Sequence, residues 1–251
     1  MEINVFPKFI DAAAGPPAQA VGNTLADIWQ LGIGNHVSLW IKKQEVRQQQ
    51  NLQDYIQRVE MKTQEIPEEF LQEPQLHIVG PAIEASKYYI DSDILREMFA
   101  NLIASSIDSR KNTETHPSFV EIIKQLSPLD ASILNNFKNI KQYSIAEIRF
   151  TKETLEYHTY QKHIMNFKDN HSFKSYATSL SNLERLGLFN IDYSSHSANE
   201  SEYDFIKVHP AYIEAEQKIN ESKYEGFTMV KFQKGLFIKT PLCEDFTSIC
   251  L

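Results

Sequence analysis

The hydrophobic period of this chain changes near Lys141, and that change limits the fold more than any other feature of its sequence. Before Lys141, apolar residues recur at the three- and four-residue intervals of amphipathic helices. After it, short β-like runs are interleaved with helical segments. We therefore expect a mainly α protein, with a helical N-terminal module over residues 1–126 and a winged-helix-like α+β module over residues 127–251.

The most apolar stretch of the N-terminal module is residues 25–41 (LADIWQLGIGNHVSLWI). It is short for a membrane-spanning helix and includes the polar residues Asp27 and Asn35. A helix packed on the protein's own core is the favoured interpretation, because that is the commoner use of an amphipathic stripe. Insertion of residues 25–41 into a membrane is the alternative, which we do not favour. The stripe consists of Leu25, Ile28, Trp29, Gly32, His36, Leu39 and Trp40.

Further helices are predicted along the rest of this module, with Asp91 or Ser92 as the N-cap of one of them. The polar residues 109–115 (SRKNTET) are expected to form a loop. Ser127 and Asp130 have the spacing of a capping box, with Pro128 between them at the first helical position, so a helix should start there. The expected helices cover residues 42–66, 78–90, 91–109, 118–126 and 128–136.

In the C-terminal half, the order of predicted elements is typical of a winged helix. A strand is expected at residues 144–150, followed by a helix at residues 172–187 that ends at Gly187. Two hairpins and a final helix from Pro241 should follow. The first hairpin would pair residues 188–193 with 203–209, and the second would pair residues 227–232 with 236–240 around Gly235.

The charge balance argues against duplex DNA as a partner. Residues 1–126 carry 11 Lys and Arg against 17 Asp and Glu, and residues 127–251 carry 14 against 16. Neither half has the basic excess that phosphate binding requires. The two cysteines, Cys243 and Cys250, are expected to be buried free thiols in a reducing cytosol, since two helical turns separate them.

A search for chemical motifs predicts no catalytic residue, no cofactor and no metal site. Gly32 and Gly34 form a bare G-x-G without the third glycine of a phosphate loop. His158 and His163, five residues apart, would lie on different faces of a helix rather than share a metal. We therefore expect a protein without enzymatic activity. A catalytic site built from distant residues remains an alternative, because such sites are recognised by geometry rather than by sequence position.

Four segments, which together cover about a third of the chain, carry a resemblance to a known family. They are PEEFLQEPQLHIVGPAIEASKYYI, LREMFANLIASSID, HPSFVEIIKQLSPLDASIL and the tail KTPLCEDFTSICL. These segments resemble the abortive infection alpha (Abi-alpha) family, a bacterial domain of unknown function. The resemblance implies a cytoplasmic bacterial protein that takes part in defence against bacteriophage. It implies no enzyme activity, cofactor or catalytic residue.

Six polar residues within the resembling block are candidates for interactions. Pairing with one another or with nearby groups inside the chain is favoured, since half-buried polar groups usually find local partners. Contact with another molecule is the alternative. The six are Glu84, Arg96, Glu97, Asn101, Asp108 and His116.

Three function classes follow. The leading one is a sensor or adaptor in phage defence that acts by binding a protein partner or a second copy of itself. The others are a winged-helix DNA-binding regulator and a membrane-perturbing effector that uses residues 25–41.

Overall fold

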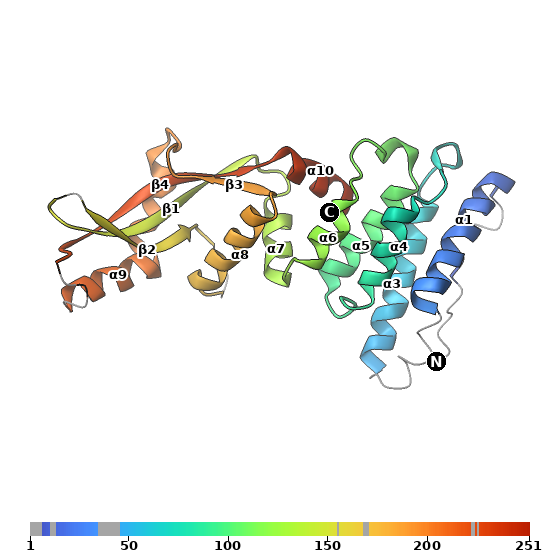
Figure 1. The fold of residues 1–251 in the computed structure, drawn as a ribbon, viewed down its shortest axis with the longest axis horizontal. Helices are drawn as coiled ribbons and strands as arrows, with labels where there is room; N and C mark the ends of the chain where they lie inside the picture. Colours follow the sequence, from blue (N-terminus) through green and yellow to red (C-terminus); the bar gives the residue numbers. More distant parts are fainter. Residues whose placement is uncertain are drawn as a thin grey trace. The chain divides into compact units, whose positions relative to one another are not determined.

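The computed structural model describes residues 7–10, 14–34, 46–154, 156–167, 171–221, 224 and 226–251. The described chain is mainly helical, with one four-stranded antiparallel sheet in its C-terminal part (Figure 1). It forms two compact units. Unit 1 comprises residues 1–135 and 245–251, and unit 2 comprises residues 136–244.

Unit 1 is built from helices that pack around α5. Leu95, Met98, Phe99 and Leu102 of α5 are buried in its core. α5 packs against α3, α4 and α6. The elements are α1 (Pro16–Trp29), the π-helical turn η1 (Gln30–Gly34), α3 (Val46–Gln64), the short 3-10 helix η2 (Glu68–Phe70), α4 (Leu76–Ser86), α5 (Asp93–Ser106), the 3-10 helix η3 (Ser109–Lys111), α6 (Ser118–Lys124), α7 (Pro128–Asn136) and the end of α10 (Pro241–Cys250).

The first part of the apolar run at residues 25–41 belongs to the core of unit 1. The Trp29 ring lies between Phe9 and Tyr55, with both centroid separations at 5.5 Å. The turn η1 approaches α4 so closely that a Cβ on Gly32 would lie 2.7 Å from the Ile83 side chain. His36, Leu39 and Trp40 fall outside the described residues. Within the described part of the chain, no helix is both long and apolar enough to cross a bilayer.

The predicted capping box at the start of α7 is confirmed. The backbone N–H of Ser127 donates to Oδ2 of Asp130 at 2.7 Å, and the backbone N–H of Asp130 donates to Oγ of Ser127 at 3.1 Å. These two bonds satisfy donors that a helix start otherwise leaves open.

The compact units differ from the ranges 1–126 and 127–251 expected from the sequence. α7 lies in unit 1 up to residue 135, and residues 245–251 return to unit 1. There, the Phe246 ring packs edge-on against Phe119 at 5.3 Å, and the side chain of Asn101 donates to the Cys250 carbonyl at 3.0 Å. Burial of the apolar C-terminus explains the difference, since residues 245–251 supply part of the core of unit 1.

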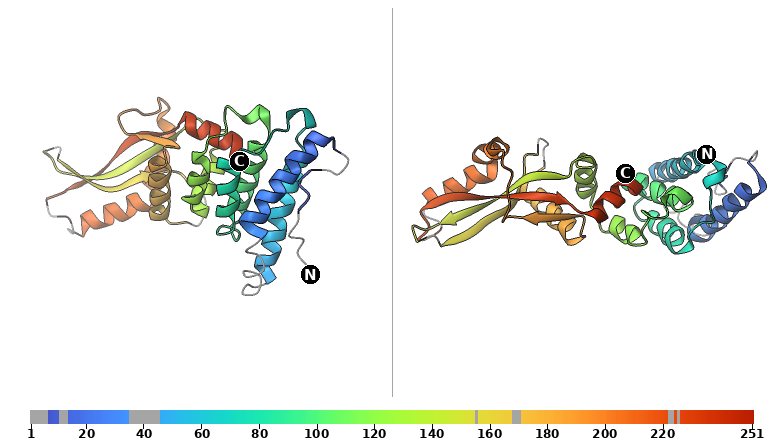
Figure 2. Two further views of the ribbon diagram at one scale, coloured as in Figure 1. Left: turned by 45° about the vertical axis from the view of Figure 1, so that its right-hand side comes forward. Right: turned by 90° about the horizontal axis from the view of Figure 1, so that it is seen from above.

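Unit 2 contains a sheet with the strand order β2-β1-β4-β3, all pairs antiparallel. Figure 2 shows α8 and α9 on opposite sides of this sheet. On the α9 side, Ala146, Ile148 and Phe150 of β1 pack against residues of α9 and of the 3-10 helix η4. The elements are β1 (Gln142–Thr151), β2 (Tyr157–Ile164), α8 (Phe173–Arg185), β3 (Phe189–Asp192), η4 (Glu200–Val208), α9 (Pro210–Asn220) and β4 (Met229–Lys239).

The helix expected at residues 172–187 is confirmed as α8. Ser172 caps its start by accepting a hydrogen bond from the Ser175 backbone at 3.1 Å. Gly187 follows its end with a left-handed φ of 74°, the conformation that favours glycine at this position. The strand expected at residues 144–150 is also confirmed, within β1.

Both predicted hairpins were wrong. Residues 203–209 lie mostly in the 3-10 helix η4, where the buried Tyr203 and Ile206 are three residues apart, as a helical period requires. Residues 227–232 and 236–240 do not pair with each other, because residues 229–239 form the single strand β4. β2 was not predicted. The winged-helix prediction rested on those hairpins and is not confirmed. The predicted α+β character of this part of the chain is confirmed, since unit 2 is built around a four-stranded antiparallel sheet.

Gly235 lies within β4 and not in a turn. A Cβ at this position would lie 2.6 Å from the Tyr193 ring and 2.7 Å from the Asp192 carbonyl. The glycine is needed because the end of β3 and the Tyr193 ring approach β4 this closely.

Candidate functional site

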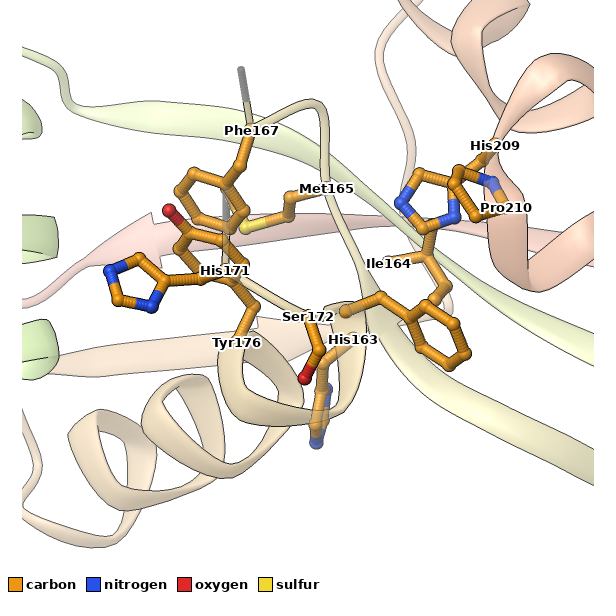
Figure 3. Close-up of a pocket in the computed structure, with 10 residues that line it drawn as sticks. His163, Ile164, Met165, Phe167, His171, Ser172, Tyr176, His209 and Pro210 are labelled. Carbon is orange, nitrogen blue, oxygen red and sulfur yellow. The ribbon is translucent and has the colours of Figure 1, made fainter. Parts of the chain in front are cut away.

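A pocket of about 240 Å³ lies in unit 2 where β2 ends and α8 begins. We call it the β2–α8 pocket. In Figure 3, Phe167, Tyr176 and His171 lie on one side of it, and His209 and Pro210 lie on the other. Its lining residues are His163, Ile164, Met165, Phe167, His171, Ser172, Phe173, Tyr176, His209 and Pro210.

Aromatic contacts hold the two sides of the pocket in place. The rings of Phe167 and Tyr176 are stacked with centroids 3.6 Å apart, and His171 meets Tyr176 edge-on at 5.9 Å. On the other side, Phe173 packs edge-on against His209 at 6.0 Å. A partner group entering the pocket therefore meets preformed, largely apolar walls.

His163 has an unusual backbone and an unusual environment. Its φ is 59°, in the left-handed region that is uncommon for residues other than glycine. Its backbone N–H donates to the Tyr193 hydroxyl at 3.0 Å, and its Nδ1 lies 3.2 Å from the same oxygen. Burial, and to a smaller extent the neighbouring charge of Lys162, lower the pKa of His163 to about 4. The imidazole is therefore neutral at physiological pH.

His209 has a structural role at the start of α9. Its Nδ1 accepts a hydrogen bond from the Ala211 backbone at 3.2 Å and so caps the helix. Burial lowers the pKa of His209 below its usual value. Burial thus disfavours the charged form of both His163 and His209, and this part of the pocket favours an uncharged group over an ion.

Three histidines line the pocket, but they do not form a metal centre. Within the described residues, no three His, Cys, Asp or Glu side chains come close enough together to hold a metal ion.

The volume of the β2–α8 pocket limits the size of its occupant, because pockets for drug-sized ligands measure roughly 300–1,000 Å³. A space of about 240 Å³ suits a single side chain or one ring.

A polar chain on the α8 side of the sheet leads from the pocket across β4 and β1. The Tyr193 carbonyl accepts from the Gln233 side chain at 3.1 Å, and Gln233 accepts from Nη1 of Arg149 at 3.2 Å. Arg149 forms an ion pair with the buried Glu147, and its guanidinium covers the Tyr157 ring at 4.1 Å. This chain fixes Tyr193, which in turn holds His163.

The six residues expected from the sequence to take part in interactions all lie in unit 1. Two of them belong to an ion network between α3 and α5. Arg96 is largely buried and lies 3.1 Å from Asp54 and 3.0 Å from Asp93. Glu97 accepts from Arg58 at 2.9 Å. These contacts join α3 to α5 and have a clear structural role.

The other four candidates also have partners within the chain, as the favoured interpretation expected. None of the six lines the β2–α8 pocket, so a role toward another molecule stays a prediction. The partners are Lys87 for Glu84 (3.6 Å), the Cys250 carbonyl for Asn101 (3.0 Å), Arg110 for Asp108 (2.6 Å) and Ser118 for His116 (2.7 Å).

The sequence did not reveal the pocket, because its residues come from separate elements. His163 was considered only at helical spacing from His158, whereas both lie on the strand β2. Tyr193 and His209 reach the site through the chain after β3 and the turn before α9. The only local signal was the cluster of His171, Ser172 and Phe173 at a predicted helix start.

Comparison with known protein families gives a match over most of the chain. The family model described as abortive infection alpha matches residues 47–250, which is most of the chain. No curated protein and no solved structure matches it.

Proposed function

Because the chain belongs to the abortive infection alpha family, we propose that it is a bacterial phage-defence sensor or adaptor that acts in the cytoplasm by binding another protein. The β2–α8 pocket is its docking site, and one side chain of the partner enters it. The chain itself carries out no reaction in this scheme. Binding the partner is the event that couples infection to the response of the cell.

The observation that carries this proposal is the size and lining of the pocket. Protein interfaces are dominated by a few side chains that fill well-packed, desolvated pockets. A preformed space of about 240 Å³ between aromatic rings and neutral imidazoles matches such an anchor. It is too small for a nucleotide cofactor, which needs the larger volume of a typical ligand site.

The two alternative functions have less support. A winged-helix regulator would use a hairpin and a basic face, but both predicted hairpins were wrong and residues 127–251 carry more acidic than basic residues. A membrane effector would use residues 25–41, whose first part is packed in the core of unit 1 around Trp29. The remaining part lies outside the described residues.

The test is a phage challenge of bacterial cells that express the chain. Phe167→Ala removes one ring of the stacked wall and opens the pocket, so partner affinity should fall by about tenfold or more. We expect the efficiency of plating to return to that of cells without the chain.

Met229→Ala is the control, since it truncates an exposed apolar residue of the same sheet outside the pocket. It should leave protection unchanged, and circular dichroism should show both variants folded. Two results would contradict the proposal. In the first, cells that express Phe167→Ala are still protected. In the second, the unaltered chain protects against no phage of a broad panel.

A further inference from the structure

A second pocket of about 380 Å³ lies in unit 2, between the start of β1, the chain after β2 and η4. We call it the Glu202 pocket. Its lining is more polar than that of the β2–α8 pocket and includes a carboxylate and two carboxamides. The residues that matter here are Gln142, Ser144, Asn166, Ser201, Glu202 and Phe205.

The carboxylate of Glu202 is fixed by a neutral partner. The Ser144 hydroxyl donates to its Oε2 at 2.5 Å, and this bond lowers the pKa of Glu202. The nearby Lys234 forms an ion pair with Glu200 instead. Glu202 therefore keeps its negative charge, and a cationic group entering the pocket would find a fixed acceptor.

The two pockets are neighbours, lined by residues that are adjacent in the chain. In the turn at residues 165–167, Met165 and Phe167 line the β2–α8 pocket, whereas Asn166 lines the Glu202 pocket. A second connection runs through η4, because Phe205 of the Glu202 pocket packs edge-on against His209 of the β2–α8 pocket, with centroids 6.4 Å apart. Successive side chains of one bound segment can therefore reach both pockets.

We propose that the two pockets together bind one extended peptide segment of a partner protein, with an aromatic or aliphatic side chain in the β2–α8 pocket and an arginine side chain in the Glu202 pocket. This inference rests on the proposed function and defines the partner that it requires. A guanidinium has five N–H donors and no acceptor, which suits a pocket with a carboxylate, two carboxamide oxygens and an aromatic wall. A phosphate group would be repelled by Glu202.

The test begins with purified full-length protein and a phage-displayed library of random peptides. We expect the enriched peptides to carry an arginine within a few residues of an aromatic or large aliphatic residue. Affinities of the best peptide and of its citrulline and lysine analogues are then measured by fluorescence anisotropy. Citrulline keeps the shape of arginine and removes its charge.

The decisive comparison uses Glu202→Gln, which keeps the side-chain shape and loses the charge. Because Glu202 is at an exposed rim, its contribution is modest, and we expect roughly a two- to fivefold weaker affinity for the arginine peptide. The citrulline peptide should bind both proteins equally. Glu216→Gln removes an exposed carboxylate of the same unit outside both pockets and should change neither affinity.

Four outcomes would overturn the inference. In the first, no peptide is enriched, and in the second the enriched peptides lack arginine. In the third, the lysine analogue binds as tightly as the arginine peptide. In the fourth, Glu202→Gln weakens the binding of the arginine and citrulline peptides equally. Failure of peptide binding, with protection still lost in Phe167→Ala, would refute the peptide and leave the proposed function standing. Peptide binding without phage protection would refute the proposed function instead.

Discussion

The environment of His163 comes from tertiary contacts that its neighbours in the sequence do not indicate. Its left-handed backbone places the N–H and the ring against a single oxygen, the hydroxyl of Tyr193. Backbone strain of this kind persists only where the surrounding structure holds it. Here Tyr193 holds His163, and Tyr193 is itself fixed by Gln233 and by its close approach to Gly235. By contrast, the Ser127–Asp130 capping box could be predicted, because both of its partners lie within four residues.

Acid should weaken the folded state through His163. Burial lowers its pKa to about 4, whereas a solvated histidine has a pKa of about 6.5. Between these values the unfolded chain binds the proton and the folded chain does not, so acid favours unfolding. The stabilising contribution of neutral His163 is complete above about pH 6.5 and is lost as pH falls toward 4.

The measurement compares thermal unfolding of the unaltered chain and His163→Asn between about pH 7 and about pH 5, the range in which a solvated histidine titrates. Asparagine tolerates the left-handed backbone and does not titrate. We expect the unaltered chain to lose more stability on acidification than the variant. His209 is present in both proteins, so its own lowered pKa cancels from the difference. Parallel pH dependences would show that His163 does not carry the effect.

Among the elements, local sequence signals predicted the helices better than the strands. α5 and α8 follow from their apolar periods, and Gly187 marks where α8 ends. β4 was divided in two because Gly235 was taken for a turn residue, while its true role is to admit Tyr193 from a neighbouring segment. The irregular pairing of β2 with β1, with register shifts beside Ile148, hides the alternation that would have identified β2. The extent of β2 and β4 depends on pairing between segments that are far apart in the sequence. A short stretch of sequence does not reveal such pairing.

The start of α7 offers a test of the capping box within one element. Ser127→Ala removes the hydroxyl that accepts from the Asp130 backbone, which should lower the free energy of unfolding by about 0.5–2 kcal/mol. Ser92→Ala is the matched control, since Ser92 occupies the N-cap position of α5 without a side-chain capping bond. Urea denaturation of both variants measures the difference. Equal losses would mean that the capping bond does not stabilise α7.

On the scale of the whole molecule, unit 2 is an insertion in the chain of unit 1, which resumes at residue 245. A change of hydrophobic period marks where a sheet begins, but it does not show that the chain later returns to an earlier core. A final helix from Pro241 was predicted, but its sequence did not indicate which surface it would cover. That surface is formed by α5 and α6, through Asn101 and Phe119.

Unit 1 should therefore depend on the last residues of the chain. Phe246 is fully buried, and its truncation to alanine leaves a cavity beside Phe119, which should lower the free energy of unfolding by about 3–5 kcal/mol. Asp245→Ala alters an exposed neighbour in the same helix and should have little effect.

Hydrogen exchange shows which helices lose stability when Phe246 is truncated. In Phe246→Ala, amides of α5 and α6 should exchange faster, although these helices lie more than a hundred residues earlier in the sequence. Unchanged protection of α5 and α6 in this variant would mean that the C-terminal residues do not complete the core of unit 1.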